Sequence, residues 1–248
     1  MNTYKLNFHP SEKELFSFLP ALKKEFEETG RGMFCNWDII IKQHYNDRVF
    51  TFLVDKDPIG FLTWSRDEKV VSLDIIWISP KFRGLGFGVL FQKLIDKEFT
   101  KRGDVALLVK CATINGYKLA MKSNFSPFSS TDNISNYNKI DITYPTYIKI
   151  LKNTDFDICD KNDCYIKIYE DLKKQIICHI IPLNYDFESN PTYFRINGEW
   201  IAEIYYEGKL LVSKKLKYLL MDLNTKLFSW RVACFDHKIN LPNKLINK

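Results

Sequence analysis

The chain has 248 residues, of which 46% are hydrophobic, 15% aromatic and 27% charged. This composition is typical of a folded globular protein and excludes an intrinsically disordered chain. The net charge of +6 is spread along the sequence, so it favours an anionic ligand but does not indicate nucleic-acid binding.

The N-terminus and the cysteines bear on where the protein resides. The first residues, MNTYKLNFHPSEKELF, contain no apolar stretch behind a positive charge, so we expect no secretory signal. No segment approaches the roughly 20 apolar residues that cross a membrane, so we expect no membrane partner. Six cysteines without a signal predict reduced thiols and a cytoplasmic protein. Cys159 and Cys164 lie among aspartates but lack zinc-type spacing, so we expect no metal.

In chain order, residues 3–8 alternate as a strand does, and a helical pattern follows from residue 11. Ser11 is the expected N-cap, with Glu14 completing a capping box, and Pro20 is expected to kink or split the helix. A second helix is expected over residues 37–45.

The middle of the chain then alternates strands and helices. Apolar runs predict a hairpin from two strands, a central strand buried on both faces, a long helix that Gly103 ends, another buried strand, a short helix and a last strand. These elements fall at residues 49–54, 59–64, 70–79, 89–103, 104–110, 115–122 and 144–151, with a polar loop at 126–138.

A polar, acidic stretch at residues 152–163 suggests a boundary, so we divide the chain into domains at 1–152 and 153–248. The second part contains short β-rich runs. Asn197-Gly198 predicts a hairpin between residues 193–196 and 199–206, and Glu207-Gly208 predicts a further turn. Residues 216–223 fit a helix or a strand, and 227–235 fit a strand.

Residues 81–90, KFRGLGFGVL, carry three glycines between the central strand and the long helix. The first N–H groups of a helix lack internal acceptors, and glycine lets a phosphate approach them closely. Arg83 adds a cation, so the turn predicts a phosphate site, whereas a plain strand-to-helix turn needs only one glycine. No Gly-Lys-Ser/Thr follows, and the glycine spacing is not Gly-x-Gly-x-x-Gly, so nucleotide motifs of both those kinds are excluded.

The segment LDIIWISPKFRGLGFGVLFQKLI resembles the acyl-CoA-binding motif of the GNAT superfamily, the Gcn5-related N-acetyltransferases. The order of predicted elements agrees with that superfamily over roughly residues 1–150. The resemblance implies an α+β protein: a three-layer α/β fold with a mixed central sheet flanked by helices, followed by a smaller strand-rich C-terminal domain. It also implies that acetyl-CoA is the co-substrate.

The resemblance also places the CoA contacts. The central strand is implied to splay from its parallel neighbour at 107–110, so that the pantetheine arm binds the open strand edge as an added strand would. Backbone amides of the glycine turn are implied to hold the diphosphate. The implied cofactor-binding residues are Ile76, Trp77, Ile78, Arg83, Gly84, Leu85, Gly86, Phe87, Gly88 and Asn115.

In this superfamily an amine attacks the thioester directly, so positioning, a base and a donor to the leaving thiolate suffice. The usual tyrosine donor position holds Ala120 here, and Tyr117 one turn earlier is the candidate substitute, with a core aromatic as its alternative. Asp74, the only acid inside the central strand, is the candidate base, or else a carboxylate bonded to a neighbour. Glu68 is the second candidate.

The leading hypothesis is therefore an acyl-CoA-dependent N-acyltransferase, with acetyl as the acyl group and a small molecule or protein as the amine-bearing acceptor. An aminoacyl-tRNA stays open as an acceptor, although the charge pattern favours no other nucleic acid. The alternatives are a degenerate GNAT-fold binding protein that acts through its C-terminal domain, or a toxin or defence factor that acetylates a cellular target. A homodimer also stays open.

Overall fold

The computed structural model describes residues 3–30, 32–128, 145–152, 164–170, 173–183, 186–189, 191–237 and 239. The expected boundary at 153–163, its aspartates and Cys159 lie outside the described residues, as does most of the expected loop at 126–138. The division into domains at residue 152 stays a prediction.

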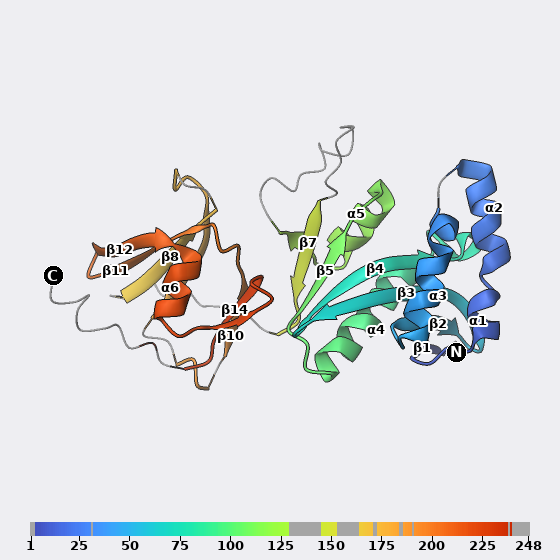
Figure 1. The fold of residues 1–248 in the computed structure, drawn as a ribbon, viewed down its shortest axis with the longest axis horizontal. Coiled ribbons are helices and arrows are strands. Elements are labelled where there is room, and N and C mark those ends of the chain that lie inside the picture. Colours follow the sequence, from blue (N-terminus) through green and yellow to red (C-terminus); the bar gives the residue numbers. More distant parts are fainter. Residues whose placement is uncertain are drawn as a thin grey trace.

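The first 150 residues follow the expected order of elements, and the C-terminal region is rich in strands (Figure 1). The N-terminal elements are β1 (Tyr4–Asn7), α1 (Glu12–Phe16), α2 (Leu19–Thr29), η1 (Met33–Asn36), α3 (Trp37–Tyr45), β2 (Val49–Val54), β3 (Asp57–Asp67), β4 (Val70–Ile78), η2 (Pro80–Phe82), α4 (Phe87–Lys101), β5 (Ala106–Lys110), α5 (Ile114–Lys122), β6 (Ser126–Pro127) and β7 (Thr146–Ile150). The C-terminal elements are β8 (Cys164–Tyr169), β9 (Ile177–Pro182), β10 (Thr192–Arg195), β11 (Ile201–Tyr206), β12 (Lys209–Lys215), α6 (Leu216–Asp222), β13 (Lys226–Phe228) and β14 (Val232–Phe235).

The N-terminal elements form a seven-stranded sheet in the order β1-β2-β3-β4-β5-β7-β6. Among its pairs only β4 and β5 run parallel. The expected mixed sheet flanked by helices, and with it the α+β class, is confirmed by this topology.

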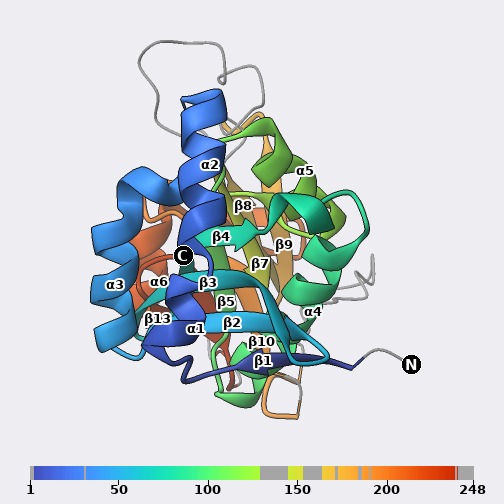
Figure 2. The same cartoon turned by 90° about the vertical axis from the view of Figure 1, so that its right-hand side faces the viewer.

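Helices cover the two faces of this sheet unequally (Figure 2). One face packs on α4 and α5 through a core that includes Phe91, Ile95 and Phe99 of α4. The other face is covered by α1 to α3 only beside β2 to β4, through Leu15, Leu22 and other apolar side chains. The remaining part of that face, on β5 and β7, is left for the C-terminal region.

The first helical stretch follows the expected cap and break, but the capping box is incomplete because the Glu14 carboxylate accepts hydrogen bonds from Asn7 and Thr51. The Ser11 side chain accepts a hydrogen bond from the Glu14 N–H at 3.2 Å, which starts α1. Pro20 lies in the first turn of α2, where its missing N–H is not needed, so the helical stretch is split rather than kinked.

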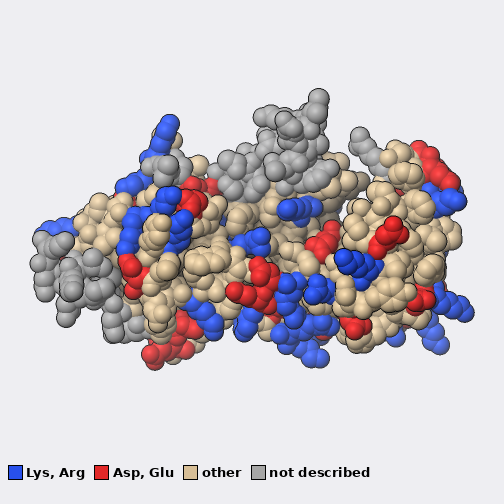
Figure 3. All heavy atoms as spheres, viewed as in Figure 1, with Lys and Arg blue, Asp and Glu red and all other residues tan. Residues whose placement is uncertain are grey.

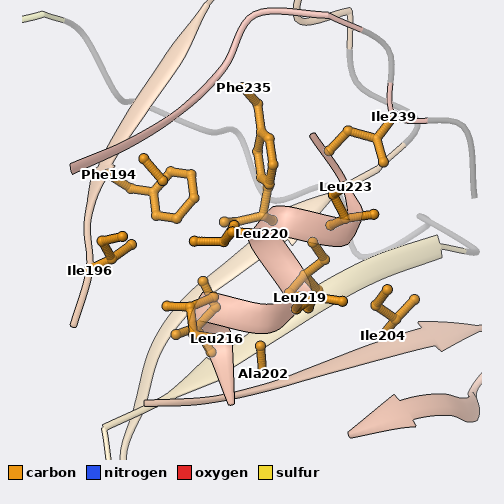
Figure 4. Packing of buried hydrophobic residues seen from close by; sticks show 14 of the residues in the cluster. Phe194, Ile196, Ala202, Ile204, Leu216, Leu219, Leu220, Leu223, Phe235 and Ile239 are labelled. Carbon is orange, nitrogen blue, oxygen red and sulfur yellow. The ribbon is translucent and has the colours of Figure 1, made fainter. Parts of the chain in front are cut away.

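The C-terminal region contains a four-stranded sheet, β12-β11-β8-β9, and a three-stranded sheet, β10-β14-β13. Helix α6 packs between them (Figure 4). Its Leu216, Leu219 and Leu220 contact side chains such as Ile204 of β11 and Phe235 of β14. Residues 216–223, which fitted either a helix or a strand by sequence, form a helix over Leu216–Asp222 whose apolar side chains are buried between the two sheets.

The three-stranded sheet packs on the uncovered face of the N-terminal sheet. Phe228, Val232 and Cys234 share a buried cluster with residues of β4, β5 and β7, among them Ala106 and Ile148. The C-terminal region therefore completes the core of the first sheet.

The expected hairpin at Asn197-Gly198 is wrong. Strand β10 pairs with β14, while β11 pairs with β8 and β12, so the two flanking strands belong to different sheets. Gly198 lacks the positive φ that a type I′ turn requires, and the Asn197 side chain accepts a hydrogen bond from Glu199 N–H instead. Glu207-Gly208 does form a hairpin turn, with φ of 47° and 75°, between β11 and β12.

Among the described residues, no helix is long and apolar enough to span a membrane.

Gly60 of β3 should be intolerant of any side chain, because a Cβ built there lies 2.6 Å from the backbone oxygen of Trp77 in β4. We expect Gly60→Ala to destabilise the protein by about 1–3 kcal/mol through forced separation of the two strands. Urea unfolding measures the change. Gly116→Ala in α5 is the control, since a Cβ there meets its nearest atom at 3.4 Å and alanine favours a helix. Equal unfolding midpoints for the two variants would contradict this packing.

Candidate functional site

The central feature of the site is the separation of β4 from β5. Their parallel pairing runs from Val70 with Ala106 to Leu73 with Val109 and then stops. Figure 1 shows the two strands starting side by side and fanning apart. Residues 74–78 of β4 consequently have no neighbouring strand on the edge that faces β5 in the described part of the chain.

A β-bulge begins this separation. Against β3, Leu73 pairs with Trp64 and Ile75 pairs with Thr63, so Asp74 is an extra residue in β4. A bulge bends its strand and re-aims side chains, which accounts for both the divergence and the unusual position of this carboxylate. Beyond the bulge, Ile76 packs toward the α4 face and Trp77 toward the α2 face.

The glycine turn lies directly after the open end of β4. Gly84 and Gly86 adopt φ of 79° and 85°, and a Cβ at either would meet nothing within 4 Å. No acceptor within the described residues pairs with the N–H groups of Gly84, Leu85, Gly86, Phe87 or Gly88. Helix α4 starts here without a side-chain cap, so its N-terminal amides and its dipole face outward together.

Helix α5 forms the opposite side of this opening. Gly88 allows a close approach, because a Cβ there would lie 3.1 Å from the Leu119 side chain. Asn115 is exposed in the first turn of α5, which Thr113 caps. The space-filling view shows an indentation between the surfaces formed by α5 and α2 (Figure 3). The turn itself is exposed at Gly84, Leu85 and Gly86.

Arg83 was expected to add a cation for a phosphate, but its side chain is hydrogen-bonded within the protein. Its guanidinium binds both oxygens of Glu25 in α2, at 2.5 and 2.9 Å, and its Nε donates to the Ile78 carbonyl at 2.8 Å. Its own N–H donates to the Pro80 carbonyl. Trp77 Nε1 also donates to Glu25, at 2.8 Å. This network fixes the turn to α2, and it leaves the amides of residues 84–88 as the open donors.

The lowered pKa of the Glu25 carboxyl indicates that its contacts with Arg83 and Trp77 favour the charged form. Burial alone would raise the pKa of its carboxyl, but the hydrogen bonds from Arg83 and Trp77 and the charge of Arg83 outweigh burial and lower the pKa. The carboxylate form is therefore the one that holds the turn.

A cavity of about 500 Å³ opens beside the bulge, on the sheet face opposite α4. It is lined by Ser72, Leu73, Asp74, Leu108, Val109, Lys110, Phe128, Thr146 and Arg231. Its walls thus come from the ends of the paired parts of β4 and β5, from β7, and from the turn between β13 and β14. Volumes of this size are typical of small-molecule sites.

Asp74 is the acid of this cavity. Asp74 is an exposed residue at the cavity wall, and partial desolvation by the surrounding protein raises the pKa of its carboxyl above its ordinary value. A hydrogen bond from Ser65 Oγ at 3.1 Å and the charge of Arg48 oppose that rise without cancelling it. A carboxylate with a raised pKa at the edge of a cavity is suited to accept a proton.

The structure separates the other catalytic candidates from one another. Glu68 lies in the β3–β4 turn, six residues from the bulge, or about 20 Å along an extended strand. Its carboxylate accepts a hydrogen bond from Ser229 N–H at 2.9 Å, so it anchors the C-terminal region rather than facing the opening. Tyr117 packs on the α4-face core with its ring 5.7 Å from that of Tyr147, which favours the core-aromatic alternative.

The end of α5 accounts for two departures from the superfamily motif. Ala120, at the usual tyrosine position, is buried in the α4-face core. Asn124, at the usual glycine position, has φ of 61°. Asparagine tolerates this left-handed conformation better than most residues, so the turn survives without glycine. Cys111 is also buried in this core.

Several residues of the site were not identified from the sequence. Glu25, Ser65, Lys110 and Arg231 are ordinary surface-type residues whose spacing carries no signal. Arg231 in particular lies more than 150 residues from Asp74 along the chain, so only the packing of the two sheets brings it to the cavity.

No protein-family model and no curated protein matches the sequence. Solved structures do match it. A PaiA N-acetyltransferase from Thermoplasma acidophilum in complex with coenzyme A covers 60% of this chain and 99% of its own, at 14% identity and a TM-score of 0.45. A GNAT-family acetyltransferase from Staphylococcus aureus Mu50 covers 60% of this chain and 100% of its own, at 16% identity and a TM-score of 0.43.

A third match is N-acetylglutamate synthase from Neisseria gonorrhoeae, complexed with coenzyme A and N-acetyl-glutamate. It covers 61% of this chain and 36% of its own, at 13% identity and a TM-score of 0.44. The Staphylococcus aureus protein is described as a member of the GNAT family, which is the superfamily that the sequence motif resembles. Because these sequence identities and TM-scores are low, the chemistry of the site has to be argued from the residues of this chain.

The Glu25–Arg83 pair generates a pH-dependent prediction. Glu25→Gln should lower the melting temperature by about 1–3 °C at pH 7, since the turn loses its anchor to α2. Because the pKa of Glu25 is lowered by folding, its stabilisation is complete above the ordinary glutamate pKa and is lost as pH falls through the lower folded value. The difference from wild type should therefore shrink below about pH 4.

Glu28→Gln serves as the control for this measurement. Glu28 lies on the same helix and faces Lys24 across 3.7 Å in an exposed pair. We expect almost no change in its melting temperature. An equal effect of the two substitutions would show that the Arg83 network does not stabilise the turn.

Proposed function

We propose that this protein is an acyl-CoA-dependent N-acyltransferase that transfers an acetyl group from acetyl-CoA to an amine. The observation that carries the proposal is the juxtaposition of five open backbone amides, Gly84 to Gly88, with the edge of β4 that no strand covers at residues 74–78, where the Ile78 carbonyl is bonded to Arg83. The amides suit the diphosphate of CoA, and the strand edge suits the amides of its pantetheine arm. The thioester would then lie in the gap between β4 and β5.

The cavity beside Asp74 supplies the place for the acceptor amine. An amine there approaches the thioester from the side of the sheet opposite α4, near the bulge. As the amine nitrogen attacks the carbonyl carbon, the carbon–sulfur bond breaks and CoA leaves as a thiolate. Asp74 accepts the proton that the nitrogen must lose. Positioning of the two substrates supplies much of the acceleration, on the order of 7–11 kcal/mol at best.

Tyr117 is our proposed donor to the leaving thiolate, because it lies one turn before the position that Ala120 occupies. Its packing against Tyr147 and the burial of Ala120 favour a second candidate function. That candidate is a protein that binds acyl-CoA without turning it over and acts through its C-terminal region. Thiol release in the presence of acetyl-CoA and amines separates the two functions.

The phosphate cradle is tested by Gly86→Glu, which places an anion among the open amides. Wild-type protein should melt roughly 5 °C higher at acetyl-CoA concentrations of about 100 times Kd, and the variant should lose this shift. Gly103→Glu is the matched control, because Gly103 has φ of 82° and equally open surroundings at the far end of α4. A wild-type protein that shows no shift at millimolar acetyl-CoA would refute the proposal.

The role of Asp74 is tested by turnover against pH. Asp74→Asn should lower kcat about 10²- to 10⁴-fold without changing the acetyl-CoA shift. In the wild type, kcat/KM should rise with pH through the raised pKa of Asp74, because only the carboxylate accepts a proton. Ser65→Ala removes a hydrogen bond that lowers this pKa, so it should move the rise to higher pH. An unchanged profile in Ser65→Ala would argue against Asp74 as the base.

A further inference from the structure

The cavity beside Asp74 contains two cations that the proposed acyl transfer does not use. Lys110 ends β5 and is exposed, and it has no ion-pair partner among the described residues. Arg231 reaches the cavity from the turn between β13 and β14. Its only ion pair in that part of the chain is with Asp67, at 3.9 Å, and both side chains are largely exposed at 44% and 68%. Such a pair is worth little, so the guanidinium is available to another anion.

The backbone around Arg231 is held firmly. Its N–H donates to the Phe228 carbonyl at 3.0 Å, and its own carbonyl accepts from Ile196 N–H at 2.8 Å. Ser229 Oγ donates to the Asp67 carbonyl at 2.7 Å, and Glu68 accepts from Ser229 N–H. The contacts of Ser229 fix the β13–β14 turn to the β3–β4 turn. They thereby hold the backbone of Arg231 beside the cavity.

The turn itself adopts a costly conformation. Ser229 and Trp230 have φ of 51° and 54°, in the left-handed region that residues other than glycine rarely occupy. The contacts with Asp67 and Glu68 offset this strain, which is consistent with a turn whose geometry matters for its side chains. Glu68 is thus a positioning residue for the C-terminal wall of the cavity.

The cavity is lined by charges of both signs. Asp74 lies at the bulge and attracts an ammonium group. Lys110 follows the last β5 residue that pairs with β4, and Arg231 lies 3.9 Å from Asp67, so the two cations reach the cavity from different elements. A simple cationic amine gains from Asp74 but is repelled by both cations. A molecule that carries an amine at one end and an anion at the other matches all three groups.

We propose, on the basis of the proposed transferase function, that the acceptor is a small amine bearing a carboxylate or phosphate, and that Arg231 of the C-terminal region binds this anion together with Lys110. The appended sheet then acts as a specificity wall of the acceptor site. Arginine suits this task because its planar fork binds a carboxylate or phosphate through two hydrogen bonds.

The test measures binding of matched probes to CoA-saturated protein by titration calorimetry. The pairs are β-alanine with β-alaninamide, and O-phosphoethanolamine with ethanolamine. In each pair the amine is kept while the anion is removed. We expect the anionic member of at least one pair to bind about tenfold or more tightly, and the favoured pair distinguishes carboxylate from phosphate.

Three variants connect the preference to its residues. Arg231→Gln should weaken the preferred anionic probe by about tenfold or more and leave its neutral partner unchanged. Arg231→Lys should recover part of the loss, since it restores the charge without the fork. Lys209→Gln, at the exposed start of β12, removes the same charge from the C-terminal region and should change nothing.

Failure of this proposal is distinguishable from failure of the transferase. A wild-type protein that binds acetyl-CoA but binds both members of every pair equally, or binds none of them, overturns the anion site alone. An equal effect of Arg231→Gln on both members of a pair overturns it as well. Absence of acetyl-CoA binding overturns the transferase.

Discussion

The site depends on one constraint, the end of hydrogen bonding between β4 and β5 after Leu73. A parallel pair that continued to Ile78 would cover the strand edge and bury the place proposed for the thioester. The extra residue Asp74 prevents this by bending β4 away. The same residue places a carboxylate at the point of divergence, so one backbone irregularity provides both the opening and the proposed base.

The surroundings of the opening hold that divergent strand in place. On one side, Gly60 lets β3 approach the backbone of β4 near Trp77. On the other side, Arg83 ties the following turn to Glu25 and to the Ile78 carbonyl. With the arginine so engaged, the backbone amides of residues 84–88 are the donors that the proposed anion would use. Those donors are fixed by the fold and need no side-chain ordering when a ligand binds.

The C-terminal region covers part of the first sheet and supplies one wall of its cavity. Its three-stranded sheet covers the face of β5 and β7 that α1 to α3 leave exposed, and its β13–β14 turn reaches the cavity. Glu68, a candidate base by sequence, is instead the anchor of that turn. Positive and negative side chains are interspersed over the face shown in Figure 3.

The sequence by itself determined the elements whose causes are local. Ser11 capped α1, Pro20 divided the helical stretch, and the glycines of residues 84–88 identified the turn with open amides. Only the tertiary structure decided where β4 leaves β5, that Asn197-Gly198 joins two different sheets, and that Glu25, Glu68 and Arg231 find distant partners. Caps, breakers and turns act over a few residues, whereas strand pairing and ion pairs depend on segments that meet only when the whole chain packs.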